Sequence, residues 1–413
     1  MRPIVVLFTR DLRVHDNPAL HAACAQADRV VPLFVHDPAV PSSPNRDRFL
    51  AQSLADLRDS LRRRGGDLVV RHGDAVAQAL AVASAVDAGG IWLAADASGY
   101  AADRQRRLAA ATDAERIELR RFDGVTIVAP GALLPSSGGD HYRVFTPYWR
   151  VWSAHPRRAL LPAPRRVVLP DGLAAGELPP VPAGASPGAV AGGEGPGRRR
   201  LRAFRGGHSG LSPYLHFGCV SALAAASTSD PLSEFVRQLC WRDFFHQVLA
   251  AFPGLGREPY RKVGEAPRQD PGALAAWQEG RTGVPIVDAA MRQLMAEGTM
   301  DNRSRLITAA FLTRSLGLDW RAGAAWYARW LVDADIANNN GNWQWVAGTG
   351  NDTKPYRRFN PIRQAHRFDP RGEFVRRWVP ELAGVAGGAV HEPWRLPAGE
   401  RRGYPSPIDD GMH

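Results

Sequence analysis

The stretch DADIANNNGNWQWVAGTG, residues 333 to 350, concentrates side chains that can bind a flat molecule with polar edges. Asp333 and Asp335 stand two residues apart, three asparagines follow in a row, and Trp343 and Trp345 flank a glutamine. Carboxylates and amides can hydrogen-bond the edge of a planar ring system, and indoles can stack on its face. A polar helix end in which the amides cap carbonyls would use the same residue types. The segment alone therefore leaves a ligand site and a structural role both open.

The first 128 residues predict a doubly wound parallel sheet, because apolar strand patterns alternate with helical patterns. The expected strands are IVVLFT, RVVPLFVHD, DLVVRHG, GIWLAAD and VTIVAP. Asp16, Asn17 and Pro18 form a helix-start signal, with a capping residue followed by proline. Ligands of such sheets bind at the carboxyl ends of the strands, here TRDLRVHDN, VHDPAV and AADASGY. No GxGxxG or phosphate-loop lysine motif occurs, so the sequence does not support dinucleotide or triphosphate binding at these ends.

The rest of the chain follows different patterns. Residues 154–200 are rich in Pro, Ala, Gly and Arg and read as a linker, with partial disorder expected. From residue 201 onward the pattern is helical, and nine of the twelve tryptophans fall between 241 and 394, which indicates a helical domain with an aromatic interior. We expect an α/β domain over 1–130, a linker over 131–200 and an all-α domain over 201–413.

Charge and cysteine content restrict the partners. The net charge is +11, and residues 1–128 carry 17 arginines against 16 acids, so the other +10 lies in residues 129–413. A basic surface on one domain is expected of a nucleic-acid partner, although arginine-rich composition can also reflect the genome. The three cysteines have no CxxC spacing, which favours a reducing cytoplasm and argues against a zinc site. No membrane span, signal peptide or metal site is expected.

Several motifs of eight or more residues, in order along the chain, resemble the DNA photolyase/cryptochrome family. They are FTRDLRVHDNPAL at the start, LSPYLHFG (211–218), CWRDFFHQVL (240–249), AWQEGRTGVPIVDAAMRQL (276–294) and DNRSRLITAAFL (301–312), and the shorter VHEPW matches near the end. The chain most resembles the bacterial class I enzymes that repair cyclobutane pyrimidine dimers. The resemblance implies an α/β antenna domain, a helical domain that holds FAD in a U-shape, and light-driven electron transfer from reduced FAD to a flipped-out lesion in UV-damaged DNA.

The resemblance assigns residues to the flavin. It places Ser209, Gly210, Leu211, Ser212 and Arg242 at the FAD phosphates, and hydroxyls and N–H groups at a helix start suit phosphate oxygens. It places Arg305, Asp333, Asp335 and Asn339 at the flavin edge. Asp333 is expected to pair with Arg305, and Asn339 is expected to face flavin N5, where an amide can accept from N5–H.

Two further groups are assigned in the same way. Trp343, Trp320 and Trp277 match the chain of three indoles that carries an electron from the surface to photoexcited oxidised flavin, although buried tryptophans can also simply fill a core. Trp241 and Trp345 match the aromatic walls for the flipped dimer, where stacking on indole replaces the lost base stacking. The expected DNA and lesion contacts also include Gln238, Asn302, Arg303, Gln364 and the arginines Arg357, Arg358 and Arg363.

The sequence departs from the family pattern at three places. Dimer photolyases usually carry Glu three residues before the pocket tryptophan, where this chain has Gln238. The glutamine is usual in (6-4) photolyases and animal cryptochromes, but the histidine pair of (6-4) enzymes is missing between Asn302 and Leu306. The phosphate segment is shortened and has His208 and Gly210 where Thr and Arg are common, which puts one phosphate contact in doubt. Phe245 takes a position often filled by tyrosine.

The antenna and the exact activity stay open at this level. The segment DASGYAADRQRRL (96–108) lies where the family binds a folate or a deazaflavin, and it lacks the acid of the folate type. We therefore favour 8-hydroxy-5-deazaflavin over methenyltetrahydrofolate, with an empty site as the other possibility. A monomeric dimer photolyase is the leading hypothesis. A cryptochrome-like photoreceptor, a (6-4)-type photolyase and a light-independent DNA-binding flavoprotein are the alternatives.

Overall fold

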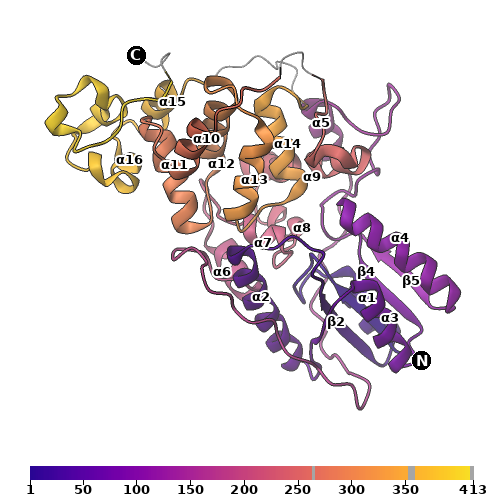
Figure 1. Cartoon of the computed structure of the whole chain (residues 1–413). Helices are drawn as coiled ribbons and strands as arrows, with labels where there is room; N and C mark the ends of the chain where they lie inside the picture. Colours follow the sequence, from indigo (N-terminus) through magenta and orange to yellow (C-terminus); the bar gives the residue numbers. More distant parts are fainter. Residues whose placement is uncertain (263–265, 352–358, 410–413) are drawn as a thin grey trace. The chain divides into compact units, whose positions relative to one another are not determined.

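The computed structural model describes residues 1–262, 266–351 and 359–409. Its contacts divide the chain into two compact units (Figure 1). The first unit comprises residues 1–184 and 191–253, and the second comprises residues 185–190 and 254–413. Residues 201–253 thus pack with the α/β part, whereas the sequence suggests a domain boundary at residue 200.

A five-stranded parallel sheet with the order β3-β2-β1-β4-β5 forms the centre of the first unit. Its strands are β1 (Ile4–Phe8), β2 (Val30–His36), β3 (Val69–His72), β4 (Gly90–Ala94) and β5 (Glu118–Phe122). The central strands β1 and β4 are buried throughout, as expected for a sheet covered on both faces. The chain direction across the sheet reverses between β1 and β4, which makes their carboxyl ends the topological switch point where ligands bind.

The fifth strand is not the one predicted from the sequence. VTIVAP was expected to form it, but the structure forms β5 from the charged segment Glu118–Phe122, ELRRF. An edge strand has one neighbour and solvent beside it, so it tolerates charged side chains. Val125 and Val128 are buried without a strand partner, and the backbone N–H groups of Ile127 and Val128 donate to the Asp243 carboxylate at 2.9 Å instead.

Capped helices connect the strands and continue to the end of the first unit. They are α1 (Pro18–Gln26), α2 (Pro44–Arg62), α3 (Ala75–Ala85), α4 (Gly99–Ala114), α5 (Phe145–Ala154), α6 (Glu194–Ala203), α7 (Ser212–His216), α8 (Ala222–Ala226) and α9 (Glu234–Ala251). Asn17 caps α1 by accepting from Leu20 N at 3.0 Å, which confirms the predicted helix start. Right-handed crossovers place α1 and α2 on one face of the sheet and α3 and α4 on the other.

The predicted linker is ordered where it passes the sheet. Val30 N donates to Val168 O at 2.8 Å, and Val70 N donates to Ala175 O at 2.7 Å. These bonds satisfy backbone groups that strand pairing leaves open, so the Pro- and Gly-rich segment follows the strands although it has no periodicity of its own. The expectation of partial disorder is wrong for this part of the linker.

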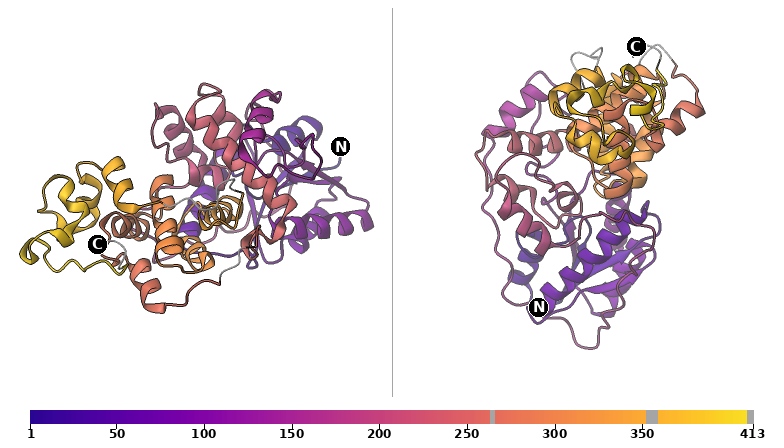
Figure 2. Two further views of the ribbon diagram at one scale, coloured as in Figure 1. Left: turned by 90° about the horizontal axis from the view of Figure 1, so that it is seen from above. Right: turned by 90° about the vertical axis from the view of Figure 1, so that its left-hand side faces the viewer.

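The second unit is helical. Its helices are α10 (Pro271–Glu279), α11 (Pro285–Glu297), α12 (Asn302–Ala310), α13 (Trp320–Trp330), α14 (Ile336–Ala347), α15 (Pro361–Phe368) and α16 (Glu373–Trp378), and a π-helical turn, Phe311–Ser315, prolongs α12. Figure 2 shows these helices in orange and yellow from two further sides. They enclose one core that contains Trp277, Trp320 and Trp343 together with aliphatic side chains. The segment 333–350 therefore forms a helix of this core rather than a helix end.

A buried carboxylate ties the C-terminal segment to the turn between α10 and α11. Asp288 accepts from Thr282 N at 2.8 Å, from Gly283 N at 3.0 Å and from the hydroxyl of Tyr404, and Ile408 N donates to Thr282 O at 2.9 Å. Burial raises the pKa of Asp288, although its hydrogen bonds act in the opposite direction. None of the helices in the described ranges is long and apolar enough to cross a membrane.

Candidate flavin and lesion site

The first unit contributes the predicted phosphate segment, a glycine-rich turn between α6 and α7. Gly206, Gly207 and Gly210 have φ values of +119°, +74° and +59°, which favour glycine. The Ser209 hydroxyl accepts from Leu211 N at 3.3 Å, and Ser212 is the first residue of α7. The turn thus exposes backbone N–H groups and hydroxyls, as a phosphate site requires.

The structure brings to this turn an arginine that the sequence analysis did not predict. Arg242 is buried and donates to Val125 O at 2.8 Å, so one edge of its guanidinium is committed to the protein backbone. Arg200, which the sequence analysis did not single out, donates from Nε to Ser209 O at 2.8 Å. It lies ten positions before Gly210 in the chain, and only the fold brings it to the turn.

The second unit contributes the predicted flavin edge. Arg305 Nη2 donates to both oxygens of Asp333, at 3.0 and 2.8 Å, and Arg305 Nε donates to Met300 O at 2.8 Å. The expected ion pair is confirmed. The Asp333 side chain is 4% exposed and that of Arg305 is 23% exposed, so the carboxylate is held almost out of water. A paired, shielded carboxylate keeps a fixed position beside whatever binds next to it.

Asp335 and Asn339 lie on the first two turns of α14. Asp335 caps the helix and accepts from Asn338 N at 2.9 Å and from Asn338 Nδ2 at 2.8 Å. Asn339 Nδ2 donates to Ala324 O at 3.1 Å, which fixes the side-chain amide so that its Oδ1 is left as an acceptor. An amide acceptor in this position suits a ring N–H such as flavin N5–H.

The three predicted electron-transfer tryptophans share one core but do not reach the surface. The rings of Trp277 and Trp343 lie 6.0 Å apart edge to face, and Tyr327 contacts both, at 6.1 and 4.9 Å between ring centroids. Trp320 is 4% exposed and Trp277 is fully buried, with its indole N–H donated to Thr308 O. Trp277 therefore does not itself meet solvent, and the electron-transfer role of the three indoles stays a prediction.

An aromatic stack in the first unit contains the predicted lesion wall Trp241. Phe145, in α5, lies parallel to its ring with 3.7 Å between centroids and 4° between planes. Phe244 and Phe245 contact the same indole at 5.5 and 5.6 Å. Trp241 itself remains only partly buried, so it can still stack on a ligand. Phe145 was not predicted, because it lies in the segment read as linker.

Gln238 stands one helical turn before Trp241 and is exposed. Its Nε2 donates to Glu234 Oε1 at 2.6 Å, a contact between residues i and i+4 of α9. The carboxylate orients the amide, which leaves the Gln238 carbonyl oxygen as the outward acceptor.

The remaining predicted lesion residues lie in the second unit. Trp345 is partly buried and meets Phe359 edge to face at 6.2 Å, and the Arg303 guanidinium lies 4.3 Å from the Phe368 ring centroid. Asn302 is exposed at the start of α12. The Gln364 Oε1 is buried and accepts no hydrogen bond from any described residue, so it can serve a ligand donor. Arg363 is exposed, and the predicted contacts Arg357 and Arg358 lie outside the described residues.

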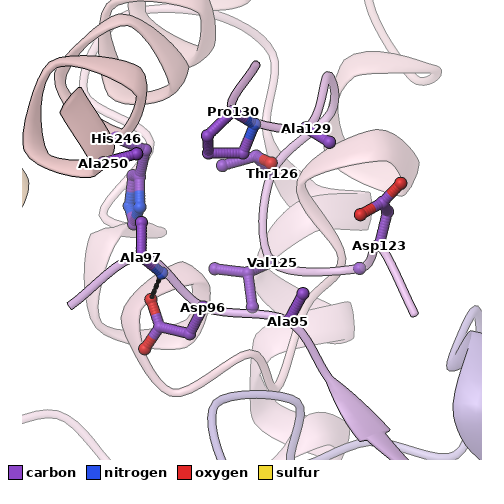
Figure 3. Close-up of a pocket in the computed structure, with 11 residues that line it drawn as sticks. Ala95, Asp96, Ala97, Asp123, Val125, Thr126, Ala129, Pro130, His246 and Ala250 are labelled. Atoms are coloured by element: carbon purple, nitrogen blue, oxygen red, sulfur yellow. Dashed lines mark hydrogen bonds between the residues drawn. The ribbon is translucent and has the colours of Figure 1, made fainter. Parts of the chain in front are cut away.

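A cavity of about 220 Å³ opens at the carboxyl ends of β4 and β5, within the first unit (Figure 3). The lining includes Asp96, Asp123 and Thr126 from the strand-end loops, and His246 from α9. Asp96 belongs to the predicted antenna segment, and its Oδ1 accepts from Ala97 N at 2.7 Å.

The same segment contains a buried cation, Arg104. It is 7% exposed, and its Nε and Nη2 atoms have no acceptor among the described residues. A buried guanidinium with unused donors fits a ligand oxygen.

Each unit, taken by itself, has donors and acceptors that suit one part of FAD. The phosphate turn supplies hydroxyl, N–H and guanidinium donors for a diphosphate, and α12 and α14 supply a fixed carboxylate and a fixed amide for a ring edge. Trp343 Nε1 is buried and has no acceptor among the described residues, so it also fits a site that takes a polar ligand. No group of three or more potential metal ligands occurs in the parts of the chain that the structure describes.

A parallel α/β sheet followed in the chain by a helical unit with a fixed polar edge and partly exposed indoles fits a flavoprotein that stacks on a planar ligand. The family described as DNA photolyase matches residues 4–166, and the FAD binding domain of DNA photolyase matches residues 235–412. The deoxyribodipyrimidine photo-lyase of Streptomyces griseus is 47% identical over 99% of this chain and 97% of its own length. Cryptochrome DASH of Gloeobacter violaceus is 33% identical over 99% of this chain and 93% of its own length.

The crystal structure of a class III photolyase from Agrobacterium tumefaciens superposes with a TM-score of 0.92 at 33% identity, and covers 99% of this chain and 95% of that one. The chain belongs to the DNA photolyase/cryptochrome family, and FAD is the cofactor of its helical part.

Proposed function

We propose that the protein is a deoxyribodipyrimidine photo-lyase that repairs cyclobutane pyrimidine dimers in UV-damaged DNA, as a monomer in the cytoplasm. The observation that carries this proposal is the occurrence, in one chain, of the fixed flavin edge of α12 and α14 and the stacking indoles Trp241 and Trp345. The 47% identity with a photo-lyase over nearly the full length of both chains supports the same activity.

Reduced FAD, when bound, supplies the photoexcited electron that opens the cyclobutane ring and takes the electron back afterwards. The protein's part is to hold the reacting groups. The Arg305–Asp333 pair fixes a carboxylate, and Asn339, anchored by Ala324 O, presents an acceptor for a ring N–H. These groups cannot rearrange without breaking partly buried hydrogen bonds, so they are preorganised for one orientation of the flavin.

Lesion binding requires that the dimer leave the DNA stack. Extrusion loses base stacking, and the loss is smallest for a damaged, unpaired base. Trp241, backed by Phe145, replaces that stacking from a preformed aromatic surface. Each unit also offers one amide oxygen that can accept from a thymine imide N–H: the Gln238 carbonyl in the first unit and the buried Gln364 Oε1 in the second. Arginine contacts with phosphates add affinity that decreases as salt increases.

The antenna chromophore that we propose is 8-hydroxy-5-deazaflavin, held at the carboxyl ends of the strands in the first unit. The unused donors of Arg104 and the cavity near Asp96 support a ligand with an acidic oxygen there. Purified protein should be mixed separately with the deazaflavin, methenyltetrahydrofolate and FMN. Only the deazaflavin is expected to be retained through gel filtration and to lose its fluorescence by energy transfer to FAD.

The repair assay uses an oligonucleotide with a single thymine dimer and enzyme with fully reduced FAD. Dimers should disappear under blue or near-UV light and persist in the dark. A Trp241→Ala variant should bind the damaged oligonucleotide more weakly by about tenfold, because stacking contributes about 1–3 kcal/mol per base. Dimer content that stays constant in the light, with reduced flavin present, would refute the proposed activity.

A photoreceptor role is the second candidate, because Gln238 replaces the usual glutamate and the relatives include Cryptochrome DASH. This role predicts that light changes the binding of a protein partner while dimers remain intact. The same irradiated sample, assayed for dimers and for flavin photoreduction, separates the two functions.

A further inference from the structure

The shortened phosphate turn lacks an arginine at position 210, yet a guanidinium occupies the space of its side chain. A Cβ added to Gly210 would lie 2.1 Å from Nη2, 2.4 Å from Cζ and 2.5 Å from Nε of Arg200. Arg200 Nε also donates to Ser209 O at 2.8 Å. Residue 210 can therefore carry no side chain while Arg200 holds this position, and its φ of +59° independently favours glycine.

The helix that carries Arg200 is firmly seated. The buried Glu194, at the start of α6, accepts from Val14 N at 2.8 Å and from His15 N at 3.1 Å. Gly197 approaches α7 so closely that a Cβ would lie 2.7 Å from the Tyr214 ring. Glu194 and Gly197 thus fix α6 within the first unit, so the helix places Arg200 next to the turn, where its exposed side chain contacts Ser209 O.

The chemistry of the guanidinium matches a diphosphate. Within the described residues, only Nε of Arg200 has an acceptor, and both Nη groups are unused. Arginine presents its donors as a planar fork that binds two phosphate oxygens at once. The neighbouring Ser209 and Ser212 add hydroxyl donors on the same turn.

We propose that Arg200 is the cation that binds the FAD diphosphate, so that an arginine from the preceding helix replaces the one missing at position 210. The inference rests on the proposed function only in that FAD is the cofactor. It explains why a glycine stands at the centre of the phosphate turn, and it assigns a role to one arginine of the run Arg198–Arg200.

The test measures flavin binding, without any repair assay. Apoprotein of the wild type and of Arg200→Gln, Arg200→Lys and Arg199→Gln is titrated with FAD and with riboflavin, which lacks both phosphates. Arg199 is the matched control, because it is exposed and adjacent on α6 and its change removes the same charge. Far-UV circular dichroism checks that each variant is folded.

Arg200→Gln is expected to bind FAD about ten- to a hundredfold more weakly, the effect of losing charge-assisted hydrogen bonds, and riboflavin unchanged. Arg200→Lys should recover part of the affinity, and Arg199→Gln should stay within about twofold of the wild type, as is usual for an exposed site. Wild-type affinity of Arg200→Gln for FAD, or an equal loss for both flavins, would overturn the inference. Wild-type protein that takes up no FAD would instead overturn the proposed function, and the role of Arg200 with it.

Discussion

Gly323 of α13 allows a test of how tightly Trp343 is held. A Cβ at this position would lie 2.1 Å from Cη2 of Trp343 and 2.6 Å from Cδ2 of Leu312. Glycine inside a helix costs about 1 kcal/mol relative to alanine, so an unhindered Gly→Ala change would stabilise the protein. Here the methyl group must displace the indole by about an ångström or more, because real carbon–carbon contacts lie near 3.5–4.0 Å.

The indole has little room to move. Its ring contacts Tyr327 at 4.9 Å and Trp277 at 6.0 Å between centroids, and Trp277 is anchored by its bond to Thr308 O. Overpacking of such a core costs about 1–3 kcal/mol, from which about 1 kcal/mol of helix propensity is recovered. The net loss of stability is therefore about 0–2 kcal/mol. Because the neighbouring rings are rigid, we expect Gly323→Ala to lower the free energy of unfolding by about 1–2 kcal/mol, the upper part of this range.

Urea unfolding followed by circular dichroism measures the stability, and the rate of light-driven reduction of bound oxidised FAD reports on Trp343. The variant should be photoreduced several-fold more slowly than the wild type. Gly99→Ala is the control, because a Cβ at Gly99 in α4 has no atom within 4 Å, and its stability should change by less than about 0.5 kcal/mol. If Gly323→Ala is as stable as the control and is photoreduced at the wild-type rate, Trp343 is not confined as argued.

Asp333→Asn should lower the free energy of unfolding by about 2–4 kcal/mol, because it leaves the partly buried Arg305 without its charge partner. Glu279→Gln, at an exposed ion pair, is the control and should change the free energy of unfolding by less than about 1 kcal/mol in the same denaturant titration. Gln238→Glu should raise the rate of dimer repair, because a carboxyl group can donate a proton to the lesion and an amide cannot; an unchanged rate per absorbed photon would show that the missing acid is not limiting. Burial raises the pKa of Cys24 to about 11 and that of Cys219 to about 12, so the reactive thiolates are scarce at pH 8. Native protein should therefore react with a thiol reagent far more slowly than urea-denatured protein, and rapid labelling of the native form at pH 8 would contradict this burial.

The sequence pattern within a short window was enough to predict those strands and helices whose own residues are apolar or carry a capping signal. Four of the five strands were located by apolar runs, and the first helix by its Asn17 cap and the proline after it. The fifth strand was misplaced because VTIV is apolar for another reason. The backbone N–H groups of Ile127 and Val128 donate to the buried Asp243 of α9. This partner lies more than a hundred residues away, so the local sequence pattern does not reveal it.

Site residues were predictable where the motif itself carries the chemistry. The Asp333–Arg305 pair was expected and is formed. Phe145 and Arg200 were missed because each lies in a segment of low periodicity and acquires its role only by packing, Phe145 on Trp241 and Arg200 on Gly210. The one available signal was the absence of an arginine at 210, which calls for a cation from elsewhere.

The bond between Tyr404 and Asp288 has a practical consequence for handling the protein. Asp288 is buried, so removing the chain from Tyr404 onward would leave its carboxylate short of a donor and would also break the Ile408–Thr282 backbone bond. Affinity tags and fusion partners are better attached at Met1, which is 85% exposed and whose amino group pairs with the surface carboxylate of Asp28. A shortened or crowded tail would therefore loosen the turn before α11 and lower the stability of the second unit.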